Sequence, residues 1–116
     1  MRLYRAVSEA ELGDIGACGV FRPDPNGFRF CKWFAFSAES AEAWGRWFAK
    51  QDGLRYYVVE TEITKEVVNV YTICDNLDNI GPAVCLQEKH LFTLPILSVP
   101  ESLIGAILSD DEIGTQ

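Results

Sequence analysis

Three residues with reactive or charged side chains, Glu88, His90 and Arg5, stand in stretches that are predicted to form strands. Their positions fall on strand faces that are otherwise apolar. Glu88 and His90 belong to an alternating run formed by Val84, Leu86, Glu88, His90, Phe92 and Leu94. Burying an ionised carboxylate without a partner costs several kcal/mol even after its surroundings relax. We therefore expect Glu88 to need a cation, a hydrogen-bond network or a cleft.

Arg5 has the complementary pattern, because alternation in the first strand places it on one face with two aliphatic residues. The sequence predicts that Arg5 and Glu88 line one pocket with His90 nearby, since functional sites gather charged groups in such surroundings. In the alternative interpretation, a bulge near Gln87 turns Glu88 outward and Arg5 lies along the surface. His90 is then a side chain with ordinary hydrogen bonds.

Ser37 is a further candidate, because it stands where an aromatic strand gives way to a helix. N-capping of that helix is enough to explain a serine at this place. No Gly-x-Ser-x-Gly elbow surrounds it, and the single His has no Asp placed to orient it, so a serine-hydrolase triad is not supported. The sequence also lacks metal-ligand spacing, a GxGxxG fingerprint and a P-loop.

The stretch from Phe30 to Phe48 organises the elements that must position these residues. It contains all three Trp and four of the seven Phe. An aromatic strand over residues 30–36 is followed by a helix that Ser37 caps and Gly53 closes. The buried stripe of this helix is expected at Ala41, Trp44 and Phe48.

The rest of the chain predicts short strands and helices around this core. Strand patterns occupy residues 2–7, 54–64, 66–73 and 84–94, with a short edge run at 95–99. Turn-forming residues place connections at 21–28 and 75–82. Capping pairs begin a short helix at Ser8 with Glu11 and a second one at Ser98 with Glu101. This order of elements favours an α+β domain with largely antiparallel pairing.

The chain of 116 residues is long enough for one domain with its own core. We place that domain at residues 1–108 and a flexible acidic tail at residues 109–116. The first residues are charged and polar, and no apolar run approaches membrane-spanning length. A soluble cytoplasmic protein without membrane contact is therefore expected.

The charge balance limits the classes of partner. The sequence has 17 acidic and 10 basic residues and a net charge of −7, which argues against a general nucleic-acid surface. A local anion site lined by Arg or Lys remains compatible with this charge. The cysteines have no CxxC pair, which predicts buried free thiols in a reducing compartment. They are Cys18, Cys31, Cys74 and Cys85.

Three segments resemble a minimal ADP-ribosyltransferase fold, as found in small bacterial toxin and effector domains. They are the first strand with its arginine, LYRAV, the strand, serine and helix of WFAFSAESAEAW, and the late segment LQEKHLFTLP. The resemblance covers most of the chain in order. It implies a compact domain of two small sheets with two or three short helices, a cleft between the sheets, and the tryptophan helix behind the cleft. NAD would be the substrate, no metal would be needed, and ADP-ribose would pass to a macromolecule such as a protein.

The resemblance also implies roles for individual residues. Arg5 would hold the NAD phosphates, and Ser37 would support the nicotinamide-ribose site. Tyr4 and Phe34 would line the same cofactor cleft. Glu88 would hydrogen-bond a ribose hydroxyl and stabilise the oxocarbenium-like transition state.

One departure from the family pattern leaves the catalytic position open. The family usually has Gln or Glu two residues before the catalytic Glu, whereas Leu86 stands there in this chain. If Glu88 is the earlier residue of the pair, His90 takes the catalytic place. Transfer to a target, simple NAD hydrolysis and silent NAD binding are then all compatible with the sequence. The alternative of another class is a non-enzymatic module whose acidic surface docks a basic partner.

Overall fold

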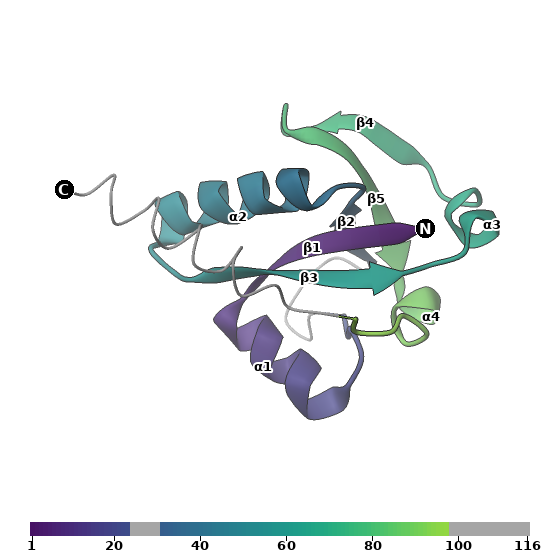
Figure 1. The fold of residues 1–116 in the computed structure, drawn as a ribbon, viewed down its shortest axis with the longest axis horizontal. Helices are drawn as coiled ribbons and strands as arrows, with labels where there is room; N and C mark the ends of the chain where they lie inside the picture. The colour runs from purple at the N-terminus through teal and green to yellow at the C-terminus, as the bar shows by residue number, and fades with distance from the viewer. Residues whose placement is uncertain (24–30, 98–116) are drawn as a thin grey trace.

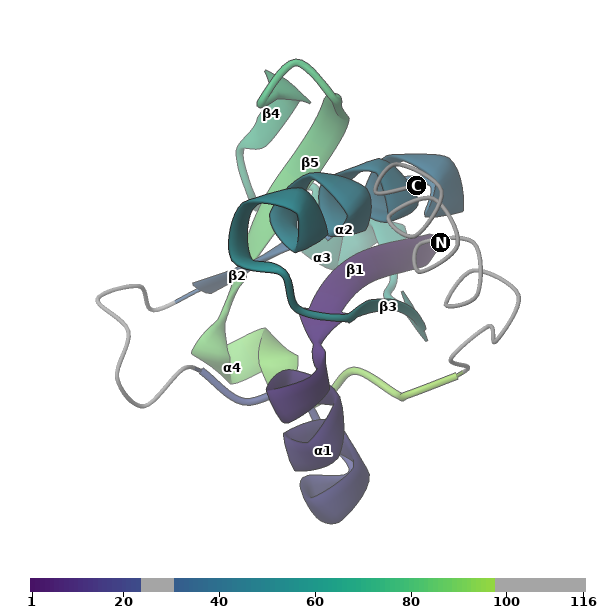
Figure 2. The same ribbon diagram turned by 90° about the vertical axis from the view of Figure 1, so that its left-hand side faces the viewer.

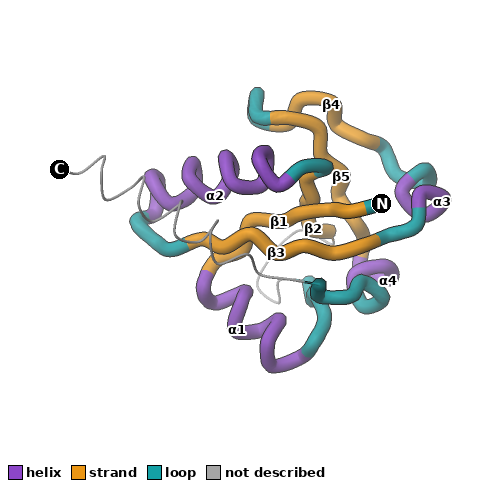
Figure 3. The backbone as a smooth tube through the Cα atoms, viewed as in Figure 1, coloured by secondary structure: helices purple, strands orange, loops and turns teal. Residues whose placement is uncertain are grey.

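The computed structural model describes residues 1–23 and 31–97, which form an α+β domain (Figures 1 and 3). The strands are β1 (Arg2–Ser8), β2 (Cys31–Ala35), β3 (Tyr56–Glu62), β4 (Ile73–Leu77) and β5 (Gly81–Gln87). The helices are α1 (Glu9–Cys18), α2 (Ala38–Asp52), α3 (Lys65–Val68) and α4 (Glu88–Leu91). In these ranges no helix has both the length and the apolar character needed to cross a membrane.

All described strands belong to one antiparallel sheet with the order β3-β1-β2-β5-β4, where the resemblance implied two sheets. β1 pairs along its whole length with β3, and β2 pairs along its length with β5. Between β1 and β2 the described register consists of Tyr4 opposite Ala35. The sheet therefore has two well-paired halves that meet closely at one point.

Helix α2 covers one face of the sheet, as Figure 2 shows. Ser37 caps it by accepting a hydrogen bond from the Ser40 backbone N–H at 3.2 Å, and Gly53 closes it in the left-handed conformation, as the sequence predicts. Ala41 and Trp44 are buried against small and aliphatic strand residues, and Phe48 packs at the edge of this cluster. The tryptophan helix is thus fixed across the sheet.

The opposite face carries the larger core, beneath α1 and α4 (Figure 1). Ser8 caps α1 by accepting from the Glu11 backbone N–H at 3.2 Å, which confirms the predicted capping box. Ile15 of α1 is buried here, with Leu12 packed beside it. Both faces of the sheet are covered, and this explains why β3 is apolar on both sides.

The predicted strand over residues 84–94 is wrong beyond Gln87, because the chain turns there into α4. A strand would bury Glu88 beside Leu86, whereas a helical turn exposes Glu88 and still buries Leu91. The exposed carboxylate avoids the desolvation cost that an apolar strand face would impose. Glu88 and His90 therefore do not lie on an apolar strand face. Glu88 is turned outward, as in the alternative interpretation, but by a helix rather than a bulge, and Arg5 does not lie along the surface as that interpretation also expected.

The predicted strand over residues 66–73 is also wrong. Residues 65–68 form α3, which buries Val68 and leaves Lys65 and Glu66 exposed. Strand β4 begins only at Ile73 and occupies part of the predicted connection. The turn that follows it is tight, with positive φ at Asp78 (55°) and Asn79 (60°), residue types that tolerate this conformation.

Several expectations fall at or beyond the described ranges. Residues 95–97 form no strand, although the Leu97 N–H donates a hydrogen bond to the Glu60 carbonyl at 3.0 Å. The loop residues 24–28, the helix expected from Ser98 and the tail at 109–116 lie outside the described residues.

A disulfide joins Cys31 of β2 to Cys85 of β5, so the prediction of four free buried thiols is wrong. The β2–β5 register brings their Cα atoms to 5.5 Å, within the range that a disulfide spans. The two cysteines are 54 residues apart in the chain, and only strand pairing makes them neighbours. Cys18 and Cys74 have free thiols, and Cys18 is exposed rather than buried.

Candidate functional site

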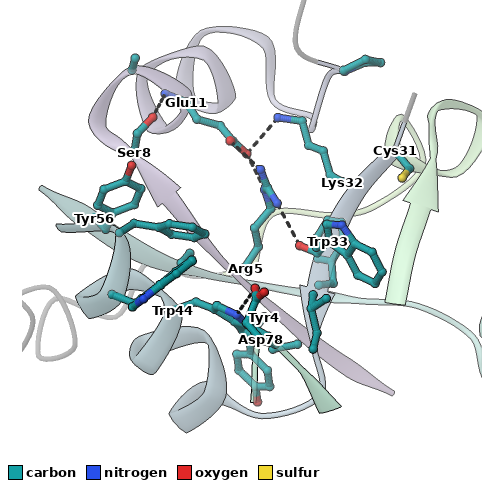
Figure 4. A pocket seen from close by; sticks show the side chains of 18 of the residues that line it. Tyr4, Arg5, Ser8, Glu11, Cys31, Lys32, Trp33, Trp44, Tyr56 and Asp78 are labelled. Atoms are coloured by element: carbon teal, nitrogen blue, oxygen red, sulfur yellow. Dashed lines mark hydrogen bonds and ion pairs between the residues drawn. The ribbon is translucent and has the colours of Figure 1, made fainter. Parts of the chain in front are cut away.

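A cavity of about 1070 Å³ follows the line along which β1 and β2 diverge (Figure 4). Its charged lining residues are Arg5, Glu11, Asp14, Arg22, Lys32 and Asp78. Its aromatic lining residues are Tyr4, Trp33, Phe34, Trp44, Trp47, Phe48 and Tyr56. The cavity thus combines three basic and three acidic side chains with exposed ring surface, a lining that can contact both the charged and the aromatic groups of a ligand.

Arg5 spans the gap between the two strands. Its Nη1 donates to the Trp33 backbone carbonyl of β2 at 2.9 Å. Its Nε and Nη2 donate to the two carboxylate oxygens of Glu11 at 2.7 and 2.9 Å, a bidentate ion pair. Between β1 and β2 the described backbone register consists of Tyr4 opposite Ala35, and next to it the Arg5 guanidinium connects the two strands through its hydrogen bond to Trp33. Three contacts fix its position, while 19% of the side chain stays exposed to the cavity.

Glu11 is the carboxylate that holds this cationic end together. It reaches the cavity from the first turn of α1, and the Lys32 ammonium of β2 lies 3.0 Å from its Oε2 atom. Burial alone would raise the pKa of Glu11, but the hydrogen bonds and charge of Arg5, followed by those of Lys32, outweigh it and lower the pKa. Glu11 is therefore ionised at neutral pH and links α1 to both β1 and β2.

An aromatic wall from α2 and the neighbouring strands faces the other part of the cavity (Figure 4). The Phe48 ring lies 5.3 Å from Trp47 and 5.5 Å from Tyr56 between centroids. Trp47 is 43% exposed, and the Trp44 indole N–H donates to Asp78 Oδ2 at 3.2 Å. Large rings held by neighbours yet open to solvent can stack on a flat ligand.

Three of the residues predicted from the sequence line this cavity, namely Tyr4, Arg5 and Phe34. Tyr4 is half-buried, and its hydroxyl donates to Glu60 Oε2 at 3.3 Å. Phe34 is only 1% exposed, with the Arg5 guanidinium carbon 6.0 Å from its ring centroid. The buried Phe34 ring therefore packs against the Arg5 guanidinium, and the Tyr4 ring is the more accessible of the two to a ligand.

The other predicted residues are not among those that line the cavity in the described ranges. Ser37 is engaged as the N-cap of α2. Glu88 is exposed at the start of α4. His90 is half-buried, contacts the Tyr71 hydroxyl through Nδ1, and packs its ring 5.4 Å from the Tyr71 ring. The structure thus brings Arg5, Tyr4 and Phe34 together and places Ser37, Glu88 and His90 elsewhere.

Sequence reasoning missed several residues that line the cavity, among them Glu11, Lys32 and Asp78, and also Asp14, Arg22 and Trp47. Glu11 is predicted only as a capping residue, whereas the prediction of Trp44 as core is confirmed, although its ring also borders the cavity. Lys32 carried a usable signal, because it is a cation inside a strand that is otherwise apolar. Asp78 carried none, since an acidic residue in a turn is ordinary.

Within residues 1–23 and 31–97 there is no group of three or more His, Cys, Asp or Glu side chains that could hold a metal ion. Comparison of the chain with models of known protein families, with curated proteins and with solved structures finds no match.

Proposed function

We propose that this protein binds NAD in the cavity between β1 and β2 and uses it as an ADP-ribosyltransferase-like domain of the toxin or effector type. The observation that carries the proposal is the combination of Arg5, fixed across the strand gap, with the aromatic wall of α2 in one cavity. NAD carries two phosphates and two flat heterocycles. A guanidinium is well suited to the phosphates, and aromatic rings are suited to the heterocycles.

The volume and placement of the cavity agree with this ligand. A space of about 1070 Å³ lies at the large end of ordinary small-molecule sites, and the extended NAD molecule needs such room. The protein as a whole carries a charge of −7, whereas the cavity lining has three basic and three acidic side chains, so the cavity repels an anionic ligand less than the rest of the surface does. Glu11 and Trp33 hold the Arg5 guanidinium in place before the ligand arrives, which reduces the ordering cost of binding.

Cleavage of the nicotinamide-ribose bond also needs a carboxylate to stabilise positive charge as nicotinamide leaves. Glu11 is poorly suited to this task, because Arg5 and Lys32 already balance its charge. Glu88 has no such ion pair among the described residues. It follows Gln87, which pairs across the sheet with Cys31, a residue of the cavity wall. We keep Glu88 as the proposed catalytic residue, although it does not line the cavity in the described ranges, so that bound NAD would have to extend past Cys31 toward α4 to reach it.

Binding is tested first, by titrating wild-type protein with NAD and comparing two arginine variants on the same strand. Arg5→Lys keeps the charge but cannot bridge Glu11 and the Trp33 carbonyl together, so we expect NAD affinity to fall about tenfold or more. Arg2→Lys is the matched control, because Arg2 makes an exposed pair with Glu60. Equal affinities of both variants and wild type would remove Arg5 from the site, and no NAD binding at all would favour the interaction-module alternative.

Catalysis is tested with Glu88→Gln, measured by nicotinamide release beside a urea melt. Because Glu88 is exposed and Arg5 is paired with Glu11 instead, the substitution should change unfolding free energy by less than about 0.5 kcal/mol. Loss of a preorganised charge should lower turnover by at least ~100-fold. Unchanged turnover in the folded variant would contradict the assignment and make His90 the next residue to test. NAD binding without turnover in wild type would identify a silent binder.

A further inference from the structure

Asp78 brings a carboxylate into the cavity from the tip of the β4–β5 hairpin. Its backbone is left-handed, with φ of 55°, and its Oδ2 atom accepts the Trp44 indole hydrogen bond at 3.2 Å. The contact ties the hairpin to α2, as the close view in Figure 4 shows. Asp78 is itself exposed, and within the described ranges its second oxygen, Oδ1, accepts no hydrogen bond. One carboxylate oxygen is thus held by the protein and the other is open to a ligand.

The charges of the cavity are distributed unevenly along its length. Arg5 and its partner Glu11 lie toward α1, while Asp78 and Trp44 lie on the α2 side (Figure 4). Tyr56 is one of the rings on the α2 side. Its phenol is neutral at pH 7 even at the ordinary pKa, and burial, followed by its hydrogen bond to Asp52, raises the pKa of Tyr56 further, to about 12. The α2 side therefore combines neutral rings with the carboxylate of Asp78.

A flat cationic ring is the ligand group that such surroundings favour. Aromatic faces attract cations by about 0.5–1 kcal/mol at exposed sites, and a carboxylate adds direct attraction. An amide N–H₂ on the ring would also find an acceptor in the open Oδ1 atom of Asp78. Oxidised nicotinamide has both features, a positive ring and a carboxamide, whereas reduced nicotinamide lacks the positive charge.

We propose that Asp78, positioned by Trp44, contacts the nicotinamide end of the ligand and makes the cavity select NAD⁺ over NADH. The inference rests on the proposed function and adds a residue that determines specificity. In this arrangement Arg5 binds the phosphates toward α1, and the cationic ring lies beside Asp78, with the exposed Trp47 of the same cavity lining available for stacking. The chain then distinguishes the two redox forms by charge, since they are nearly the same in size.

The competing explanation is that Asp78 only completes a turn and caps an indole. Asp78→Asn separates the two explanations, because Asn tolerates the left-handed conformation and keeps an oxygen for Trp44 while the charge is lost. Asp75→Asn is the matched control, since Asp75 is an exposed acidic residue of β4 that does not line the cavity. A purely structural role predicts the same ligand preference in both variants and wild type.

The experiment measures dissociation constants for NAD⁺, NADH and ADP-ribose by isothermal titration calorimetry, with released nicotinamide checked by chromatography after each run. We expect wild type and Asp75→Asn to bind NAD⁺ about tenfold more tightly than NADH, because only NAD⁺ has a cationic ring for the aromatic contact and for the charge of Asp78, whereas both forms carry the carboxamide. Asp78→Asn should lose this preference and keep its affinity for ADP-ribose. If Asp78→Asn keeps the preference for NAD⁺ over NADH, the inference is overturned. It is also overturned if wild type binds ADP-ribose but shows no such preference. Either result would leave the proposed function standing.

Failure to bind any of the three ligands would instead overturn the proposed function, and the inference with it. A second measurement uses only wild type, in case Asp78→Asn does not fold. The preference for NAD⁺ should shrink as salt is raised, because the charges involved are accessible to solvent. A preference that is independent of salt would contradict a role for the Asp78 charge.

Discussion

At the scale of single residues, the position of Arg5 depends on Glu11. The carboxylate engages the guanidinium through both oxygens and draws Lys32 to the same point. A partly buried cation without such a partner would pay a desolvation penalty of several kcal/mol. Glu11 thus acts as a positioning residue for the cationic end of the cavity and also contributes to folding.

The depressed pKa of Glu11 predicts how stability depends on pH. The folded-state pKa lies below the ordinary value of 4.5, so the unfolded chain binds the proton first as acid is added. The stabilisation is fully present above about pH 4.5 and is lost as pH falls through the lower folded-state pKa. Urea melts of wild type and Glu11→Gln should therefore differ most near pH 7 and converge in acid. A difference that grows as pH falls would contradict the ion-pair account.

At the scale of elements, the site depends on how two helices begin and end. Capping fixes the start of α1 at Ser8, which puts Glu11 within reach of Arg5. The start of α2 at Ser37 sets which of its residues face the sheet, and Trp44 is one of them. The gap between β1 and β2 then gives the space into which these side chains project.

Two glycines give a matched prediction for these helices. Gly53 closes α2 with φ of 72°, so Gly53→Ala should destabilise the protein by about 1 kcal/mol. Gly16 lies inside α1, and a Cβ added there would meet no neighbouring group within 4 Å, so Gly16→Ala should stabilise the protein by about 0.5–1 kcal/mol. Urea denaturation of both variants checks the signs. Equal shifts in the same direction would show that these helix boundaries are misplaced.

At the scale of the whole molecule, the sheet is two halves joined at Tyr4 and Ala35, with the cavity between them. The half containing β1 and β3 supplies Arg5 and Tyr56. The half containing β2, β5 and β4 supplies Lys32 and Asp78. Any ligand that filled the cavity would therefore contact both halves. The Cys31–Cys85 disulfide fastens β2 to β5 within the second half, and Cys31 also lines the cavity.

Removing the disulfide should lower the stability of the whole domain. The bridge closes a segment with a sequence separation of 54, for which loop-closure entropy predicts about 4 kcal/mol. Cys31→Ser with Cys85→Ser, or wild type under reducing conditions, should show this loss in urea melts. Cys18→Ser is the control, since its exposed thiol is free. A reductant that leaves the melt of wild type unchanged would contradict the bridge.

The sequence by itself determined the elements whose signals are local. Ser8 with Glu11, Ser37 and Gly53 marked helix ends, because capping acts between residues a few positions apart. Alternation identified β1 and β3, and Arg5 was singled out because a cation among aliphatic residues needs a partner. The α+β class follows from these elements alone.

Tertiary structure decided everything that depends on contacts between distant segments. Alternation continued past Gln87, but burial of Leu91 beneath the sheet favoured a helical turn and left Glu88 in solvent. The partner of Arg5 turned out to be Glu11, and Cys31 found Cys85 only through strand pairing. Local propensity differs little between a strand and a short helix, so the long-range burial of a few side chains decides between them. For the same reason the cavity, a gap between strands far apart in the chain, could not be read from the sequence.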